Sequence, residues 1–230
     1  MLAAVALAAL LARVPAAAEL ATVAVPSPGR AAPAATGGCH CYRDRTFEPD
    51  RPAAADPYVL ATTRSSLLSA AFGVDKRSLV ATVMTGTPAE DLWVAHWAGA
   101  RTGRPAEALL ALREDRGTWA AALQGLPGLT GAAAAALAAG ADARALASLA
   151  VDEVLVSRMG AAATAVQALR AGGASPEERI LASALAAHLG TPTGPLAAEV
   201  RAGRTTWGRI ITEAGLVPKD LDGLVRRLVR

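Results

Sequence analysis

A helix-start pattern that occurs twice in one register restricts the fold of this chain more than any other feature of its sequence. Thr87-Pro88-Ala89-Glu90 and Ser175-Pro176-Glu177-Glu178 share one order: a hydroxyl residue, a proline next to it, and a glutamate three positions on. This is the order of a capping box with proline in the first helical position. Both patterns therefore predict the start of a helix, and the two starts are 88 residues apart.

The match continues beyond the two helix starts without a gap. At the same offset Thr118-Trp119 aligns with Thr206-Trp207, and threonine is a suitable N-cap for a helix that begins at the tryptophan. We therefore predict two copies of a three-helix unit, over residues 87–126 and 175–214. The expected helices are 88–101, 105–115 and 118–125 in the first unit and 176–189, 194–202 and 206–214 in the second.

Composition and apolar spacing favour helix throughout the body of the chain. The sequence is 53% hydrophobic but 3% aromatic, so alanine, leucine and valine supply most of the apolar surface, and alanine has the highest helix propensity. Further helices are expected over Leu60–Phe72 and Lys76–Met84, and over Val151–Met159 and Ala161–Arg170 as packing partners that join the units. The predicted fold is all-α: a multi-helical array or bundle of short helices with a duplicated three-helix unit, in a domain over residues 59–230.

The first 38 residues differ in character from the helical body. Met1–Leu11 is an apolar run, and Pro15-Ala16-Ala17-Ala18 supplies the small residues that precede a leader-peptidase site, so residues 1–18 are predicted to be a signal peptide. The run is shorter than the roughly 20 residues of a membrane-spanning helix, and we expect no such helix in the mature chain. Residues 19–38 are rich in proline, alanine and glycine and are predicted to be a flexible linker. The predicted localisation is periplasmic or secreted.

Residues 39–58 are predicted to be an irregular segment, and they hold both cysteines of the chain. Cys39-His40-Cys41 allows three interpretations. The cysteines can form a strained, reducible disulfide, which would make the segment redox-active. The two thiolates and the imidazole can instead bind zinc or copper as a cofactor. In the third interpretation the segment is a structural strap that lays Tyr42, Phe47 and Tyr58 across the helices.

A lipid anchor at Cys39 is a further hypothesis, which the sequence disfavours. A lipid-bearing cysteine normally follows the apolar run of a leader directly and has a leucine-like residue three positions before it. Cys39 instead follows a long linker and has Thr36 at that position. We therefore expect no lipid anchor on the mature chain.

The stretch around the cysteines contains a recognisable series of residues: Cys39-His40-Cys41-Tyr42, Arg45, Phe47, Ala55-Asp56-Pro57-Tyr58 and Leu60-Ala61-Thr62-Thr63. This series resembles the opening of a family of small secreted bacterial helical proteins of unassigned activity. The resemblance extends over residues 39–120. It implies export and a helical body, and it implies no mechanism and no catalytic residue.

Aromatic and arginine side chains are the candidates for contact with a partner. Trp119 and Trp207 begin the third helix of their units, so they are either a pair of exposed aromatic sites or the fillers of two small cores. The scarcity of other aromatic residues favours the cores. His96 and His188 are not at equivalent positions of the units, and each is more simply a structural residue. The full candidate set is Tyr42, Arg45, Phe47, Tyr58, Trp119 and Trp207.

No catalytic motif stands out in the sequence. There is no His-Glu-x-x-His, no Gly-x-Ser-x-Gly and no glycine-rich phosphate loop, so we expect no enzymatic activity. The net charge of +3 is small for a protein that binds nucleic acid. We expect an exported helical protein that binds another protein, a peptide or an envelope component in a groove between its two units. The alternatives are a redox-active or metal-binding periplasmic protein that uses Cys39, His40 and Cys41, and a helix-turn-helix-like DNA binder.

Overall fold

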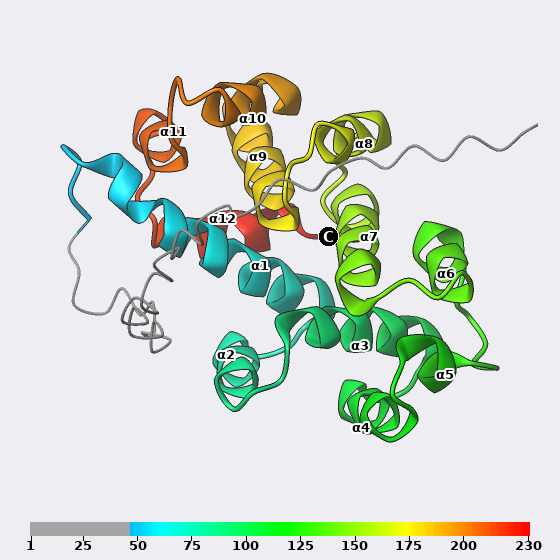
Figure 1. The fold of residues 1–230 in the computed structure, drawn as a ribbon. Coiled ribbons are helices and arrows are strands. Elements are labelled where there is room, and N and C mark those ends of the chain that lie inside the picture. Colours follow the sequence, from blue (N-terminus) through cyan, green and yellow to red (C-terminus); the bar gives the residue numbers. More distant parts are fainter. Residues whose placement is uncertain (1–46) are drawn as a thin grey trace, which may run out of the picture. The chain divides into compact units, whose positions relative to one another are not determined.

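The structure is a computed structural model that describes residues 47–230, and the secondary structure in this range is helical (Figure 1). No strand occurs among these residues, so the predicted all-α class is confirmed. The elements are the 3-10 helix η1 (Pro52–Ala55) and the α-helices α1 (Asp56–Phe72), α2 (Lys76–Met84), α3 (Ala89–Thr102), α4 (Ala106–Arg116), α5 (Trp119–Leu123), α6 (Gly131–Ala138), α7 (Ala143–Ser157), α8 (Ala163–Ala171), α9 (Pro176–Leu189), α10 (Thr193–Arg201), α11 (Trp207–Glu213) and α12 (Asp220–Leu228).

Four of the longer helices, α1, α3, α7 and α9, form the centre of the described residues (Figure 1). α3 packs against α7, α7 against α9, α9 against α1 and α1 against α3, so the four helices close a ring of contacts. Each contributes fully buried side chains, such as Val59, Trp93, Leu146 and Leu181. Each large apolar side chain buried in this way stabilises the fold by about 1.5–3 kcal/mol.

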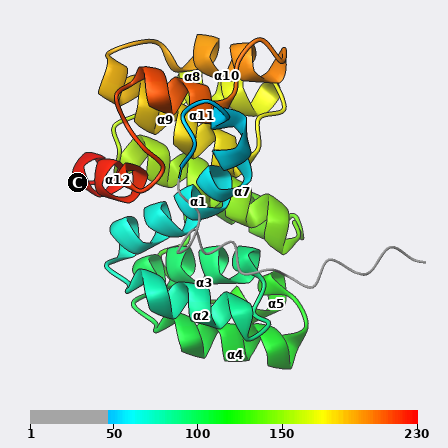
Figure 2. The ribbon, with the colours of Figure 1, turned by 90° about the vertical axis from the view of Figure 1, so that its left-hand side faces the viewer.

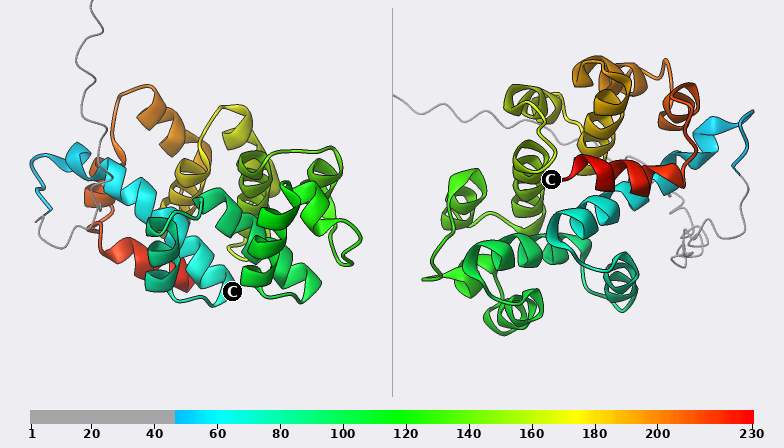
Figure 3. Two further views of the ribbon diagram at one scale, coloured as in Figure 1. Left: turned by 60° about the horizontal axis from the view of Figure 1, so that its bottom comes forward. Right: turned by 180° about the vertical axis from the view of Figure 1, so that it is seen from behind.

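The shorter helices cover the outside of these four. α2 packs on α1, α4 on α3, α5 on α4, α6 and α8 on α7, and α10 on α9, while α12 lies along α1 (Figure 3). Figure 2 shows α2 to α5 at one end and α8 to α11 at the other, with α1, α7 and α12 between them. α7 contacts both α3 and α9. The helix predicted over Val151–Met159 begins earlier, at Ala143, and the helix predicted over Ala161–Arg170 occurs as α8. That these helices join two units stays a prediction, as the units themselves do.

The two predicted units occur as three helices each, but their third helices pack differently. All six helices begin within one residue of their predicted starts. In the first unit α5 packs on α4, whereas in the second unit α11 packs on η1 and α1. The order of the helices recurs and the packing of the third helix does not, so the duplication itself stays a prediction.

The two matching helix starts also differ in detail. At α9 the predicted capping box is present, because Ser175 Oγ accepts the N–H of Glu178 at 3.2 Å and Glu178 Oε2 accepts the N–H of Ser175 at 2.7 Å. At α3 the predicted capping box is wrong, because Pro88 is the N-cap and no side chain caps the helix. Glu90 instead accepts a hydrogen bond from Arg64 Nη1 at 3.1 Å.

Arg64 of α1 connects the first turns of α3 and α9. Its Nη1 donates to Glu90 Oε1 and to Glu177 Oε1, the latter at 3.0 Å. The Arg64 side chain is only 15% exposed, so solvent screens these ion pairs less than it screens surface pairs. One guanidinium thus fixes the starts of both matching helices against the central helix α1.

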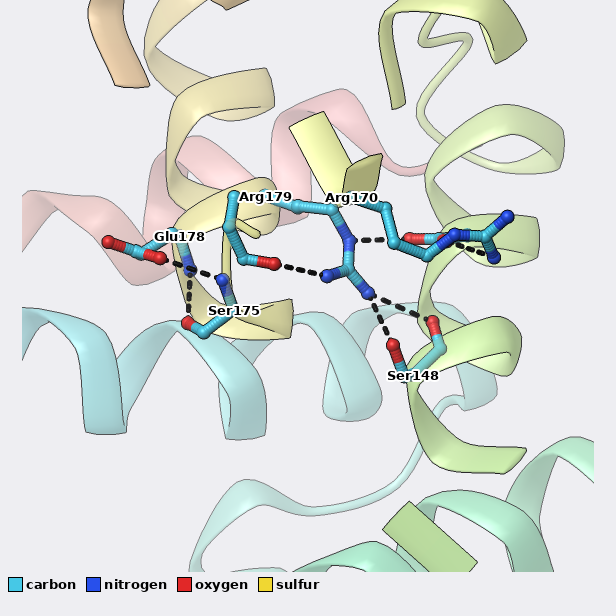
Figure 4. A network of polar contacts seen from close by, with 7 residues as sticks. Ser148, Arg170, Ser175, Glu178 and Arg179 are labelled. Carbon is cyan, nitrogen blue, oxygen red and sulfur yellow. Dashed lines mark hydrogen bonds and ion pairs between the residues drawn. The ribbon is translucent and has the colours of Figure 1, made fainter. Parts of the chain in front are cut away.

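A buried polar network connects α7, α8 and α9 (Figure 4). Arg179, which is 1% exposed, donates from Nε to Asp152 Oδ1 at 2.6 Å and from Nη1 to the carbonyl oxygen of Ala174 at 2.6 Å. Its Nη2 donates to the carbonyl and hydroxyl oxygens of Ser148, at 3.1 and 2.7 Å. Arg170 donates to the second carboxylate oxygen of Asp152 at 3.1 Å. Burial raises the pKa of Asp152, and the guanidiniums of Arg179 and Arg170 oppose that rise.

The chain before α1 docks on α11. α1 begins at Asp56, so the last residues of the segment predicted to be irregular are helical, because Pro57 is compatible with a first helical turn. The carboxylate of Asp56 accepts the main-chain N–H groups of Trp207 and Gly208, at 3.1 and 2.7 Å, and so caps α11. A Cβ at residue 208 would overlap the carbonyl oxygen of Pro52, so only glycine permits this close approach.

Candidate functional site

Several predicted features lie outside the described residues. They are the signal peptide (1–18), the linker (19–38), and the site candidates Cys39, His40, Cys41, Tyr42 and Arg45. The redox, zinc or copper, and lipid-anchor hypotheses for this segment therefore stay predictions. Within residues 47–230, no group of three or more histidine, cysteine, aspartate or glutamate side chains is placed to hold a metal ion.

The predicted aromatic candidates that the structure describes pack into or against the core. Phe47 and Tyr58 are partly buried against the central hydrophobic cluster. Trp119 and Trp207 are only 2% and 1% exposed, so the interpretation of these two as exposed aromatic sites is wrong. Both are core residues, but they belong to one hydrophobic cluster and do not fill two separate small cores. Trp119 Nε1 donates to Asp91 Oδ1 at 2.6 Å, which satisfies its buried N–H. The two tryptophans begin α5 and α11, at opposite ends of the helical body, and do not form one site (Figure 2).

A hollow of about 310 Å³ lies between α1, α3, α4 and the end of α7. Its size is near the lower limit of small-molecule pockets in proteins. It lies beside the first unit, and no residue of α9 to α11 lines it, so it is not a groove between the two units. Five lining residues are apolar or small and three are polar: Ala71, Phe72, Gly99, Ala100 and Ala106, together with His96, Arg104 and Arg158.

The wall between α3 and α4 depends on small residues and a tight reversal of the chain. A Cβ at Gly99 would lie 2.7 Å from the carbonyl oxygen of Arg104, closer than such atoms normally approach. Gly103 ends α3 in the left-handed conformation, with φ of 71°, and Pro105 is the N-cap of α4. The chain therefore turns back within a few residues and brings Arg104 to the hollow.

His96 is the titratable ring of the hollow. Its imidazole is half-buried and stacks on Phe72, with 6.1 Å between ring centroids and 22° between ring planes. Neither ring nitrogen is hydrogen-bonded to another residue in the described part of the chain. Burial lowers the pKa of His96, and the nearby carboxylate of Glu107 opposes that change. The ring is therefore mainly neutral at pH 7 and keeps both nitrogens available.

Arg104 and Arg158 give the hollow a positive charge. No carboxylate within residues 47–230 pairs with either guanidinium, and Arg158 makes one long contact, from Nη1 to the carbonyl oxygen of Arg230 at 3.4 Å. The N-terminus of α4 adds to the positive potential, because Ala106 lines the hollow and no side chain caps this helix. Glu107 supplies the opposing negative charge near His96.

The sequence does not indicate this site. Phe72, Arg104 and Arg158 lie at or next to the ends of helices that are far apart in the chain, and no local pattern connects them. The one usable signal is His96, a polar residue between Trp93 and Trp97 in a helix that is otherwise mostly apolar at its centre. The sequence alone favours a structural role for this histidine, and its tertiary neighbours place it in a hollow instead.

Comparison with known proteins does not assign a function to this hollow. The chain matches no protein-family model, no curated protein and no solved structure. The resemblance based on the cysteine-containing series therefore stays a prediction. No helix within residues 47–230 has the length and apolar character that a bilayer span requires.

Proposed function

We propose that this chain is an exported, non-enzymatic helical protein that binds a peptide segment of another protein in the hollow between α1, α3, α4 and α7. One observation carries the proposal. The hollow combines an aromatic ring, a half-buried imidazole without a hydrogen bond and two guanidiniums without a carboxylate partner among the described residues.

The half-buried imidazole of His96 is a polar group partly removed from water, and such groups are normally paired within a protein. Arg104 and Arg158 are exposed, whereas the partly buried Arg64 and the buried Arg179 have carboxylate partners. A concave, partly apolar site with a few convergent polar groups is typical of a ligand-binding surface. The lining residues include no carboxylate, thiol or hydroxyl group, and Glu107, which acts on His96, does not line the hollow. This composition supports binding over catalysis.

Selection from a random peptide library displayed on phage tests this function. Ala100 lines the hollow and is exposed, so Ala100→Trp fills the site with little disturbance of the core. Ala187, an exposed residue of α9 that does not line the hollow, provides the matched control Ala187→Trp. We expect peptides that bind the unmodified protein and Ala187→Trp and lose binding to Ala100→Trp. Absence of any enriched peptide, or equal binding to both variants, would contradict the proposal.

A further inference from the structure

We infer that the group bound in the hollow is a carboxylate carried next to an apolar or aromatic side chain, as at the C-terminal residue of a peptide. This inference rests on the proposed function and specifies the chemistry of its ligand. It follows from three properties of the lining: its size, its apolar part and the sign of its charge.

The size of the hollow corresponds to one residue. A volume of about 310 Å³ holds on the order of ten non-hydrogen atoms, if each needs the space of a water molecule. A single large amino-acid side chain with its terminal carboxylate has about that many atoms. Longer segments would have to lie across the surface outside the hollow.

The apolar part of the lining suits a flat or branched apolar side chain. Ala71, Ala100 and Ala106 line the hollow with short side chains, so a bulky apolar group has room against them. Phe72 offers an aromatic ring already stacked with His96. A second ring can pack against this pair in an offset or edge-on arrangement, which stabilises aromatic contacts beyond the effect of buried area.

The charged part of the lining selects an anion. Arg104 and Arg158 come from two different chain segments, and guanidinium forks bind carboxylates through paired hydrogen bonds. The uncapped N-terminus of α4 lies at the same hollow and favours negative charge as well. Glu107 acts on His96 and supplies the opposing negative charge nearby, but it does not line the hollow.

Three short peptides titrated into the ¹⁵N-labelled full chain test the inference. The probes are acetyl-Ala-Phe with a free carboxylate, the same peptide with a C-terminal amide, and acetyl-Glu-Phe-amide, which moves the carboxylate to a side chain. Phenyl phosphate is the fourth probe. We expect the free acid to bind at least about tenfold more tightly than the amide, the effect of one charge-assisted hydrogen bond.

Tighter binding of acetyl-Glu-Phe-amide than of the amide would also support a carboxylate ligand and would identify an acidic side chain as its source. Equal binding of the free acid, the Glu peptide and the neutral amide would overturn the inference, and so would tighter binding of phenyl phosphate or the absence of binding by all four probes. The peptide-library experiment tests the proposed function separately. If it yields peptides that bind in the hollow and show no preference for a carboxylate, the proposed function stands and this inference is refuted.

Substitutions of the two arginines locate the effect. Arg104→Gln and Arg158→Gln should each weaken binding of the free acid about tenfold and leave binding of the amide unchanged. Arg144→Gln, at the opposite end of α7 and outside the hollow, is the matched control. Far-ultraviolet circular dichroism and thermal unfolding verify that each variant folds. Folded variants that bind the free acid as tightly as the unmodified protein would contradict the assignment.

Discussion

Replacement of Arg179 by methionine should destabilise the fold more than any other single loss of charge among the described residues. Arg179→Met keeps a long apolar side chain and removes four hydrogen bonds, one to Asp152, one to Ala174 and two to Ser148. Asp152 keeps Arg170, but the Arg170 side chain is 41% exposed and neutralises the carboxylate less effectively. Removing one partner of a buried ion pair costs about 3–5 kcal/mol, and we expect a loss near 3 kcal/mol because Arg170 remains.

Urea unfolding followed by circular dichroism at pH 7 measures this loss as the change in the free energy of unfolding. Arg170→Met is the matched control, because it leaves Arg179 paired with Asp152, and it should cost about 1 kcal/mol or less. The double variant Asp152→Leu/Arg179→Met removes both charges and should recover part of the loss. A loss below about 1 kcal/mol for Arg179→Met would refute the reasoning that this network holds α7, α8 and α9 together.

The remaining predictions concern pH, packing and export. Burial lowers the pKa of His96 in the folded state, so on acidification the unfolded chain binds a proton at a higher pH than the folded chain does. The free energy of unfolding should therefore fall as the pH is lowered from 7.5 to 5.5, by about 1.4 kcal/mol per unit of pKa shift. His96→Gln should remove that fall in urea titrations, and His188→Gln should not. Gly208→Ala should cost about 1–3 kcal/mol because its methyl group collides with η1, whereas Gly194→Ala, with open space around it, should cost nothing measurable by the same method. Expressed with residues 1–18 in a bacterial host, the chain should reach the periplasm cleaved after Ala18 if these residues are the predicted signal peptide, and an intact mass that retains them would contradict export.

Sequence-based predictions succeeded where a feature depends on residues that are close together along the chain. The start of α9 depends on Ser175 and Glu178, which lie within one helical turn, and the capping box predicted there is present. The same pattern at Thr87 gives no capping box: Pro88 is the N-cap of α3, and Glu90 binds Arg64 of another helix. Local patterns therefore predicted where the helices begin and also the caps of α5, α9 and α11, whereas the start of α3 has no side-chain cap.

Features that depend on packing between distant segments could not be predicted in this way. Arg179 stands beside the acidic pair at the start of α9 and has the sequence context of a surface residue, yet it is buried because Asp152 and Ser148 of α7 receive its donors. The hollow is a further case, since Phe72 and Arg158 meet only when α1 and the end of α7 pack around α3 and α4. The burial of Trp119, in contrast, could be predicted, because the chain has few other aromatic residues to fill its core.

The location of a bound peptide is the most direct test of the central claim, which is that the hollow is the binding site. Amide chemical shifts of the full chain should be recorded with and without a peptide selected from the random library. The account predicts that the largest changes fall on residues around the hollow, including Phe72, His96, Gly99 and Arg104. Changes confined to the exposed apolar residues Val80, Val83 and Met84 of α2, or to Cys39-His40-Cys41, would contradict it.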